Sequence, residues 1–596
     1  MNSKTTGIWF VIAAVLFAFI FVFEHYLRPV VAGPTPLLPY LRAAAVTSVQ
    51  VYPANAPEIS ANRTNGGWFL ARPVSYPAQA AAIGALLDAL QKISPARITA
   101  SELREHGNYE AEFGFENPQA TLVITADGQS WQLKVGNKTA PGDQVYLRVV
   151  GVDGVDVADA GWLNLIPHAG DEWRDTALVN AGQNDFDWIV LTNNAKGIAI
   201  ELRRDPTNHL WRIIRPLLAR ADTDHITDAL QQLEAASVTQ FITDDSNADL
   251  AAFGLQPADL DLWLGRGTNL VAAVHVGKNP TNDATQVYAK REGWNTVVTT
   301  AREPLAPWRG AASDFRDTRL FELTAPVAEI EVRGQNNFIL REQGSNDWKI
   351  VGEKFPADAD NVQLFIKTLA GLRITEFVKD AVTKPDLTNY DLAAPRCEII
   401  LRSKAGDTNA VITELDFGAV QTNGVFVRRP DENFIYAIRW QDFHRAFPDG
   451  DWQFRDRRIW DFAGSSVAQI TIHQGGKTRQ IIQDGPGKWS LAAGSQGFIE
   501  GKYIEQTVEM FRQLNAVGWF ALNFNEPDYG FSTNNLQITF ELKNGQKDTV
   551  DFGGEFPQEH TALAAVTLDG DRWGFVLPPA LYQLSWSYLT IPANVP

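Results

Sequence analysis

Three Arg-Asp pairs set among apolar residues are the first candidates for chemistry in this sequence. A guanidinium beside a carboxylate can serve as a catalytic pair, an anion clamp or a structural latch. The pairs are Arg174-Asp175 in "EWRDTAL", Arg316-Asp317 in "DFRDTRL" and Arg455-Asp456 in "QFRDRRI". The residue types alone do not decide between these three roles.

No local metal, phosphate or nucleophile motif accompanies the pairs. The His and Cys residues show no HxH, HxxxH or CxxC spacing, and there is no GxSxG or GxGxxG. "DSNAD" from Asp245 resembles the start of a calcium loop, but Leu250 and Gln256 stand where Gly and Glu are required, which favours a solvated loop. "GGKT" from Gly475 lacks the first Gly of a phosphate loop and predicts a hairpin turn. The sequence therefore predicts no catalytic residue, no metal site and no cofactor.

Composition sets wider limits on function. The 596 residues are 45% hydrophobic and 20% charged, which is typical of folded globular protein, and the length suggests several domains. The net charge of -18 opposes binding to the phosphates of nucleic acid. The only cysteine, Cys397, cannot form an intramolecular disulfide, and its alternating surroundings indicate a buried strand residue.

One uncharged apolar run, "GIWFVIAAVLFAFIFVF", lies near the N-terminus. We interpret 1–7 as a cytoplasmic tail, 8–23 as a transmembrane anchor and 24–45 as a Pro-rich spacer. A cleaved signal peptide is the alternative, because Val30 and Ala32 precede Gly33 in a small-residue pattern. The predicted location is the bacterial inner membrane, crossed once, with most of the chain periplasmic or otherwise extracytoplasmic.

The elements that must position the Arg-Asp pairs repeat with a period of about 140 residues. The first marker is a Trp-led strand, and the second is an aromatic turn in "FGFENP", "FGLQPAD", "YDLAAP" and "YGFSTNN". The third is a Gly that ends a strand. The marker Trp residues are Trp68, Trp211, Trp348 and Trp489, and the strand-ending Gly residues are Gly136, Gly277, Gly418 and Gly553.

Each copy combines alternating apolar runs with one stretch of helical period, such as Ile83, Leu86, Leu87, Leu90 and Ile93. We therefore predict an α+β fold of four tandem repeats, each a mostly antiparallel sheet with a packed helix. The predicted boundaries are 46–180, 181–326, 327–466 and 467–596.

The repeats favour one role for the Arg-Asp pairs. A pair closes each of the first three copies, and the fourth copy, which nothing follows, has none at "SYLTIPA". We predict that the pairs latch neighbouring repeats together and that the four marker Trp residues anchor the cores. For the Trp residues outside the marker, exposed binding platforms stay an alternative; these are Trp131, Trp162, Trp294, Trp440 and Trp573.

The marker order resembles the bacterial family called domain of unknown function 4340 (DUF4340). The first copy matches best through Trp68, Pro73, Phe113, Gly114, Pro118, Gly136, Thr139, Tyr146, Arg148, Arg174 and Asp175. The third copy has Asp391 in place of the turn Gly, and the fourth lacks the marker Pro and the Arg-Asp pair. The resemblance implies an anchored extracytoplasmic protein accessory to ABC-type transporters of the gliding-motility kind, without established catalytic residues.

Composition, repeats and resemblance together predict a non-catalytic membrane-anchored scaffold or adaptor with membrane-protein partners such as ABC transporter subunits. The alternative is a module that binds an envelope polysaccharide or a peptide through exposed aromatic residues or sheet edges. An enzyme is the third candidate, because acid-base groups from distant segments can assemble only in the fold.

Overall fold

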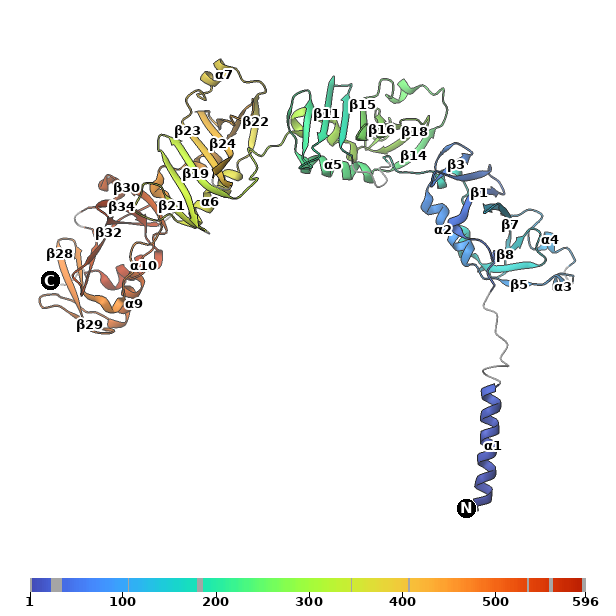
Figure 1. Cartoon of the computed structure of the whole chain (residues 1–596), viewed down its shortest axis with the longest axis horizontal. Coiled ribbons are helices and arrows are strands. Elements are labelled where there is room, and N and C mark those ends of the chain that lie inside the picture. The colour runs from blue at the N-terminus through green and yellow to red at the C-terminus, as the bar shows by residue number, and fades with distance from the viewer. Residues whose placement is uncertain are drawn as a thin grey trace. The chain divides into compact units, whose positions relative to one another are not determined.

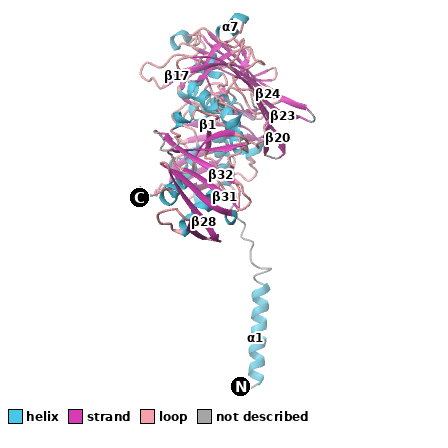
Figure 2. Cartoon of the chain, turned by 90° about the vertical axis from the view of Figure 1, so that its left-hand side faces the viewer, coloured by secondary structure: helices cyan, strands magenta, loops and turns pink. Residues whose placement is uncertain are grey.

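The computed structural model describes residues 3–22, 35–104, 107–179, 186–344, 346–405, 408–532, 535–556 and 561–591. The chain divides into two compact units, Met1–Arg316 and Asp317–Pro596, and each unit holds two antiparallel sheets (Figure 1). In both units more residues lie in strands than in helices (Figure 2). The predicted α+β class and the four repeated units are confirmed.

Repeat 1 forms a nine-stranded sheet in the order β4-β3-β2-β1-β6-β7-β8-β9-β5. Its strands are β1 (Val46–Pro53), β2 (Ile59–Thr64), β3 (Gly67–Arg72), β4 (Tyr76–Pro77), β5 (Ala96–Ile98), β6 (Ala120–Ala126), β7 (Gln129–Lys138), β8 (Gln144–Val149) and β9 (Val155–Asp159). Its helices are α2 (Ala80–Lys92), α3 (Ala100–Leu103) and α4 (Tyr109–Glu112).

Repeat 2 forms a second nine-stranded sheet in the order β13-β12-β11-β10-β15-β16-β17-β18-β14. Its strands are β10 (Trp188–Asn193), β11 (Ile198–Arg204), β12 (Trp211–Arg215), β13 (Ala219–Arg220), β14 (Val238–Thr243), β15 (Leu260–Arg266), β16 (Asn269–Val276), β17 (Gln286–Arg291) and β18 (Val297–Ala301). Its helix is α5 (Thr223–Ala235).

Repeat 3 has an eight-stranded sheet in the order β21-β20-β19-β23-β24-β25-β26-β22. Its strands are β19 (Val327–Gly334), β20 (Phe338–Gly344), β21 (Asp347–Ile350), β22 (Ile374–Lys379), β23 (Cys397–Ala405), β24 (Thr408–Val420), β25 (Gly424–Arg428) and β26 (Ile435–Arg439). Its helices are α6 (Ala359–Ala370), α7 (Lys384–Asn389) and α8 (Trp440–Ala446).

Repeat 4 has an eight-stranded sheet in the order β29-β28-β27-β31-β32-β33-β34-β30. Its strands are β27 (Val467–Gln474), β28 (Lys477–Gly485), β29 (Lys488–Leu491), β30 (Gly518–Leu522), β31 (Gln537–Leu542), β32 (Lys547–Phe556), β33 (Thr561–Leu568) and β34 (Asp571–Val576). Its helices are α9 (Gly501–Phe511) and α10 (Pro579–Leu584), and the latter continues into a π-helical turn, η12 (Ser585–Leu589).

One long helix in each repeat packs its apolar stripe on the sheet. In repeat 1 the stripe of α2 is buried, and it joins a core with alternate residues of β1 and β6. In repeat 4 the stripe of α9 is buried against β31 and β32 in the same way. Because helix and strand periods each leave one apolar face, burying these faces together gives each repeat its own core. The marker Trp residues Trp68, Trp211, Trp348 and Trp489 are all buried.

The second and third markers occur together because they touch. The N–H of the residue after the strand-ending Gly donates to a carbonyl of the aromatic turn, as in Asn137 to Phe113 at 2.7 Å and Lys278 to Phe253 at 3.1 Å. A Cβ atom on Gly277 would lie 2.1 Å from the Phe253 oxygen, which forbids any side chain there. The turn itself has a positive φ, and in repeat 3 Asp391 adopts it with φ 55°.

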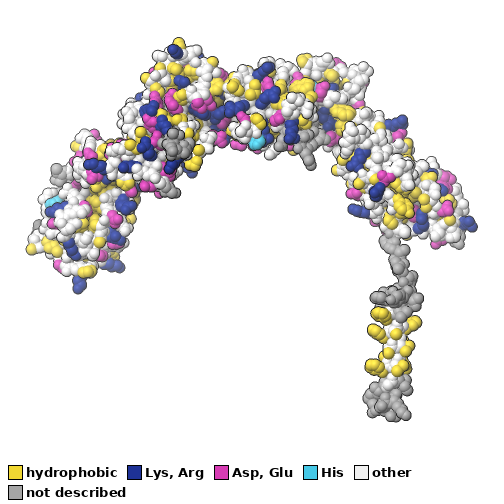
Figure 3. Space-filling model, viewed as in Figure 1, with side chains coloured by type: hydrophobic (Ala, Val, Ile, Leu, Met, Phe, Trp, Pro, Cys, Tyr) yellow, Lys and Arg dark blue, Asp and Glu magenta, His cyan; other side chains and the backbone are white. Residues whose placement is uncertain are grey.

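The N-terminal helix α1 runs over Ser3–Val22, and its described side chains are those of residue 7 and residues 9–21 (Figure 3). The apolar side chains of this stretch are exposed. Within the described part of the chain, no helix has both the length and the hydropathy needed to cross a membrane. The transmembrane assignment of 8–23 therefore has no support from the structure.

Candidate functional site: the repeat junctions

Three junction segments, 173–179, 315–321 and 454–460, pass the chain from the helix of one repeat to the helix of the next. Before each Arg-Asp pair, an aromatic residue's carbonyl accepts a hydrogen bond from the N-cap of the preceding repeat's helix. These bonds are Gln79 to Trp173 at 2.8 Å, Asp222 to Phe315 at 2.8 Å and Asp358 to Phe454 at 2.7 Å.

After each pair, an apolar residue donates its N–H to a carbonyl just past the following repeat's helix. These bonds are Leu178 to Ala236 at 3.0 Å, Leu320 to Leu372 at 3.3 Å and Ile459 to Leu514 at 2.8 Å. The Arg-Asp pair thus stands at the point where the backbone changes repeats.

In the first junction, the Arg174 side chain is 4% exposed and reaches from the end of repeat 1 into repeat 2. Its Nη2 atom pairs with Asp244, which follows β14, and its Nη1 atom lies 3.0 Å from Asp171. Its guanidinium carbon lies 4.1 Å from the ring centroid of Phe241 and 4.7 Å from that of Tyr76. Arg174 is therefore held by a carboxylate and a ring of repeat 2 and by a ring of repeat 1.

Asp175 makes the reciprocal contact. Its Oδ2 atom accepts a hydrogen bond from Arg291 Nη1 of repeat 2 at 3.1 Å, and its N–H donates to Pro77 of repeat 1 at 2.8 Å. Arg291 also lies 4.7 Å from the Tyr76 ring, so that two guanidinium groups flank one buried phenol. Burial raises the pKa of Tyr76, and the neighbouring Arg291 partly opposes this rise.

The third junction uses more rings and fewer carboxylates. The Arg455 carbon lies 4.6 Å from the Phe355 ring of repeat 3 and 4.3 Å from the Trp573 ring of repeat 4. The Asp569 carboxylate is 3.8 Å from Nη2, and the buried Nη1 atom has no hydrogen-bond partner among the described residues. Burial lowers the pKa of Arg455, although Asp569 opposes this effect. The Asp456 N–H donates to Pro356 at 2.9 Å, as Asp175 does to Pro77.

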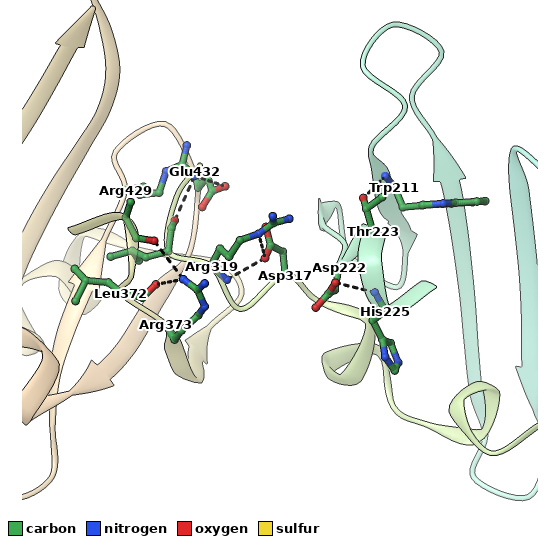
Figure 4. A network of polar contacts seen from close by, with 12 residues as sticks. Trp211, Asp222, Thr223, His225, Asp317, Arg319, Leu372, Arg373, Arg429 and Glu432 are labelled. Carbon is green, nitrogen blue, oxygen red and sulfur yellow. Dashed lines mark hydrogen bonds and ion pairs between the residues drawn. The ribbon is translucent and has the colours of Figure 1, made fainter. Parts of the chain in front are cut away.

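The middle pair lies where the two compact units meet along the chain, and Figure 4 shows the residues on both sides. Arg316 is buried in the first unit and forms a β-bridge with Ala221. Asp317 is buried in the second unit, where its Oδ1 atom accepts hydrogen bonds from the N–H of Arg319 at 2.9 Å and from its Nε at 3.0 Å.

Repeats 1 and 4 each contain contacts that resemble those of the junctions. Leu37, within the predicted spacer, donates its N–H to Ile93 just past α2 at 2.8 Å, and Leu37, Leu38 and Leu41 are buried in the core of repeat 1. The end of the predicted spacer is thus part of the first repeat. In repeat 4, Arg479 of β28 donates to Phe498 at 2.6 Å and to Thr590 at 2.9 Å.

Sequence reasoning found the three Arg-Asp pairs but not their partners. Tyr76 and Phe355 stand at the same place before a helix, and Arg291 lies on β17, more than a hundred residues after Asp175. An apolar pair begins four residues after the Arg of each Arg-Asp pair, and Leu37-Leu38 is a similar apolar pair before repeat 1. This similarity was the one sequence signal that could have placed Leu37 and Leu38 in the core of repeat 1.

The other predicted chemical motifs do not form a catalytic or metal centre. The "GGKT" stretch forms the turn between β27 and β28, with φ 57° and 75° at its two Gly residues. Asp249 of "DSNAD" accepts a hydrogen bond from the Ala251 N–H and caps a short helical turn. The described residues include no cluster of three or more potential metal ligands. Outside the marker, Trp162 and Trp573 are buried, whereas Trp440 is 40% exposed.

Comparison with known proteins gives a family but no activity. A family model described as "Domain of unknown function (DUF4340)" matches residues 68–209, 211–353 and 348–534, and each match begins at a marker Trp. No curated protein and no solved structure matches the chain significantly.

Proposed function

This chain belongs to the DUF4340 family, and we propose that it is a non-catalytic, membrane-anchored extracytoplasmic scaffold or adaptor. The observation that carries the proposal is the geometry of the first and third junctions. There a buried Arg is enclosed by rings from both neighbouring repeats, at distances of 4.1–4.7 Å. Buried Arg side chains fix each of these repeats against its neighbour. A protein built in this way is suited to holding its binding surfaces at fixed positions relative to one another.

The anchor belongs to this proposal. The run from Gly7 to Phe23 contains no charged residue, and its described apolar side chains lie exposed along α1. An uncharged helix of this kind is stable when lipid covers it, because each of its backbone groups is satisfied within the helix. We place the anchor in the bacterial inner membrane and the four repeats outside the cytoplasm.

The proposed partners are membrane proteins, namely ABC-type transporter subunits of the gliding-motility kind, as the family resemblance suggests. Nucleic acid is not a proposed partner, because the net charge of -18 repels phosphates. Neither a metal nor another cofactor is part of the proposal.

The test is purification of the tagged full-length chain from its native membrane in mild detergent, with mass spectrometry of bound proteins. We expect permease and ATPase subunits to co-purify, and to be lost when residues 1–34 are removed. The deletion stops at 34 because Leu37 and Leu38 belong to the core of repeat 1. A control that exchanges 7–23 for an unrelated apolar span separates anchoring from specific helix contacts. Recovery of the chain without any membrane protein would overturn the adaptor proposal.

A further inference from the structure

Repeat 4 carries a groove on the face of its sheet that α9 does not cover. Val550 and Phe552 of β32 belong to the core under α9, so Asp551 between them points to the opposite face. Gln537 of β31 is the cross-strand neighbour of Asp551. A cavity of about 630 Å³ opens over these two residues, which is within the size range of ligand pockets.

The floor of this groove is an ordered polar network. Arg572 Nη2 lies 2.6 Å from Asp551 Oδ2, and Arg572 Nε donates to Glu526 Oε1 at 2.9 Å. Gln537 Nε2 donates to the other oxygen of Asp551 at 2.6 Å. The side chains of Arg572 and Asp551 each keep 22% of their surface exposed, so they remain available at the floor.

The charges around the groove balance. Arg572 and Lys477 oppose Glu526 and Asp551, and the remaining polar lining consists of neutral amides, hydroxyls and His473. A strongly anionic ligand would meet the two carboxylates, and an apolar ligand would remove water from the exposed polar groups of the lining without replacing its hydrogen bonds. Such a surface matches a neutral molecule that offers many hydroxyl groups.

Repeats 1 and 2 use the corresponding position differently, whereas repeat 3 also has an aspartate there, the buried Asp416. In repeat 1 it is Lys134, whose Nζ donates to the Phe115 carbonyl of the aromatic turn at 3.1 Å. In repeat 2 it is His275, whose two ring nitrogens lie 2.6 Å from Asp261 and 2.7 Å from Glu292. In repeat 4 the hydrogen-bonded network of Asp551, Gln537 and Arg572 lines an open cavity.

We propose that the groove of repeat 4 binds a neutral oligosaccharide segment, with Asp551, Gln537 and Arg572 as hydrogen-bonding residues. This site is independent of the adaptor role, because no residue of the junctions or of α1 lines it.

The test is calorimetric titration of the purified full-length chain with maltotetraose, cellotetraose and chitotetraose, each up to about 10 mM. We expect at least one to bind, and to slow amide hydrogen exchange in β31 and β32. Gln537→Ala removes one donor and one acceptor from the floor and should weaken binding about tenfold. Gln469→Ala is the matched control, because Gln469 lies on the neighbouring strand β27 but not in the groove lining.

Several results would overturn the proposal. They are the absence of binding by all three sugars, an equal loss in the Gln469 and Gln537 variants, and protection of strands outside repeat 4. Preference for oligogalacturonate, which carries carboxylates, would refute the neutral class of ligand. A thermal melt of both variants separates a lost contact from a lost fold, and Gln537→Glu, which keeps the shape, gives a second binding measurement if Gln537→Ala unfolds.

Discussion

Replacing Arg174 by Ala tests the junction geometry most directly. The side chain is 4% exposed, and its partner Asp244 is 29% exposed. Breaking a buried ion pair lowers stability by about 3–5 kcal/mol, whereas an exposed pair contributes about 0–1 kcal/mol. For the half-buried pair of Arg174 and Asp244 we therefore take a contribution of about 2 kcal/mol to the stability of the junction. The contacts with the Phe241 and Tyr76 rings add about 1 kcal/mol together. We therefore expect the junction to lose about 3 kcal/mol, or about 150-fold in its opening equilibrium.

Native-state hydrogen exchange measures this loss where it occurs. The amides of Asp175 and Leu178 bond to opposite repeats, at 2.8 Å to Pro77 and 3.0 Å to Ala236, so they report opening of the junction. We expect these amides to exchange about 150-fold faster in Arg174→Ala, while amides in the middle of β1 and β10 change little.

A matched variant and a double-mutant cycle make the result specific. Arg203 forms an ion pair with Glu201 in the same unit but is 52% exposed, so Arg203→Ala should leave the junction amides unchanged. In the cycle of Arg174→Ala with Asp244→Ala, we expect a coupling of about 2 kcal/mol. Junction amides that exchange at the wild-type rate in Arg174→Ala would show that the pair and the rings do not hold the repeats together.

Three further changes test other parts of the fold. Burial raises the pKa of Asp416 to about 7, so its protonated form favours the folded state. The contribution of Asp416 to stability should therefore fall as the pH rises from about 4 through about 7, and thermal melts should show Asp416→Asn becoming more stable relative to the wild type over that window. Arg479→Ala removes two charged hydrogen bonds, each contributing about 1.5 kcal/mol, and should speed exchange and proteolysis in α10 and η12 by about 150-fold. Gly277→Ala should destabilise repeat 2 by about 3 kcal/mol in calorimetry because its Cβ atom would strike the Phe253 carbonyl, whereas Gly84→Ala, in open space on α2, should stabilise by about 1 kcal/mol.

Local sequence patterns were enough to predict the repeats and their class. The predicted helical stripe of Ile83, Leu86, Leu87 and Leu90 is buried on α2. It could be predicted because a helical period of apolar residues is recognisable within one short stretch of sequence. The pairing of strands such as β1 with β6 was not predictable in this way, because it joins segments about 75 residues apart.

The candidate site was predicted only in part for the same reason. Arg174 and Asp175 stood out because the pair recurs in three copies. Arg291 lies more than a hundred residues after Asp175, and an Arg at its position does not recur in every copy. The leucines at 37 and 38 were assigned to a spacer because prolines surround them, although their burial is decided by the core that they meet.

The missing Arg-Asp pair in the last repeat has a physical explanation. In repeats 1 and 3 the carbonyl two residues before the helix N-cap, that of Pro77 or Pro356, accepts the N–H of the junction Asp. The equivalent carbonyl in repeat 4 belongs to Phe498, and there Arg479 donates to it from within the same repeat. Arg479 therefore supplies, from within repeat 4, the donor that the junction Asp supplies in repeats 1 and 3, and its second bond holds Thr590. In repeat 4 the carbonyl before the helix is thus satisfied by a side chain of the same sheet, without a junction Asp.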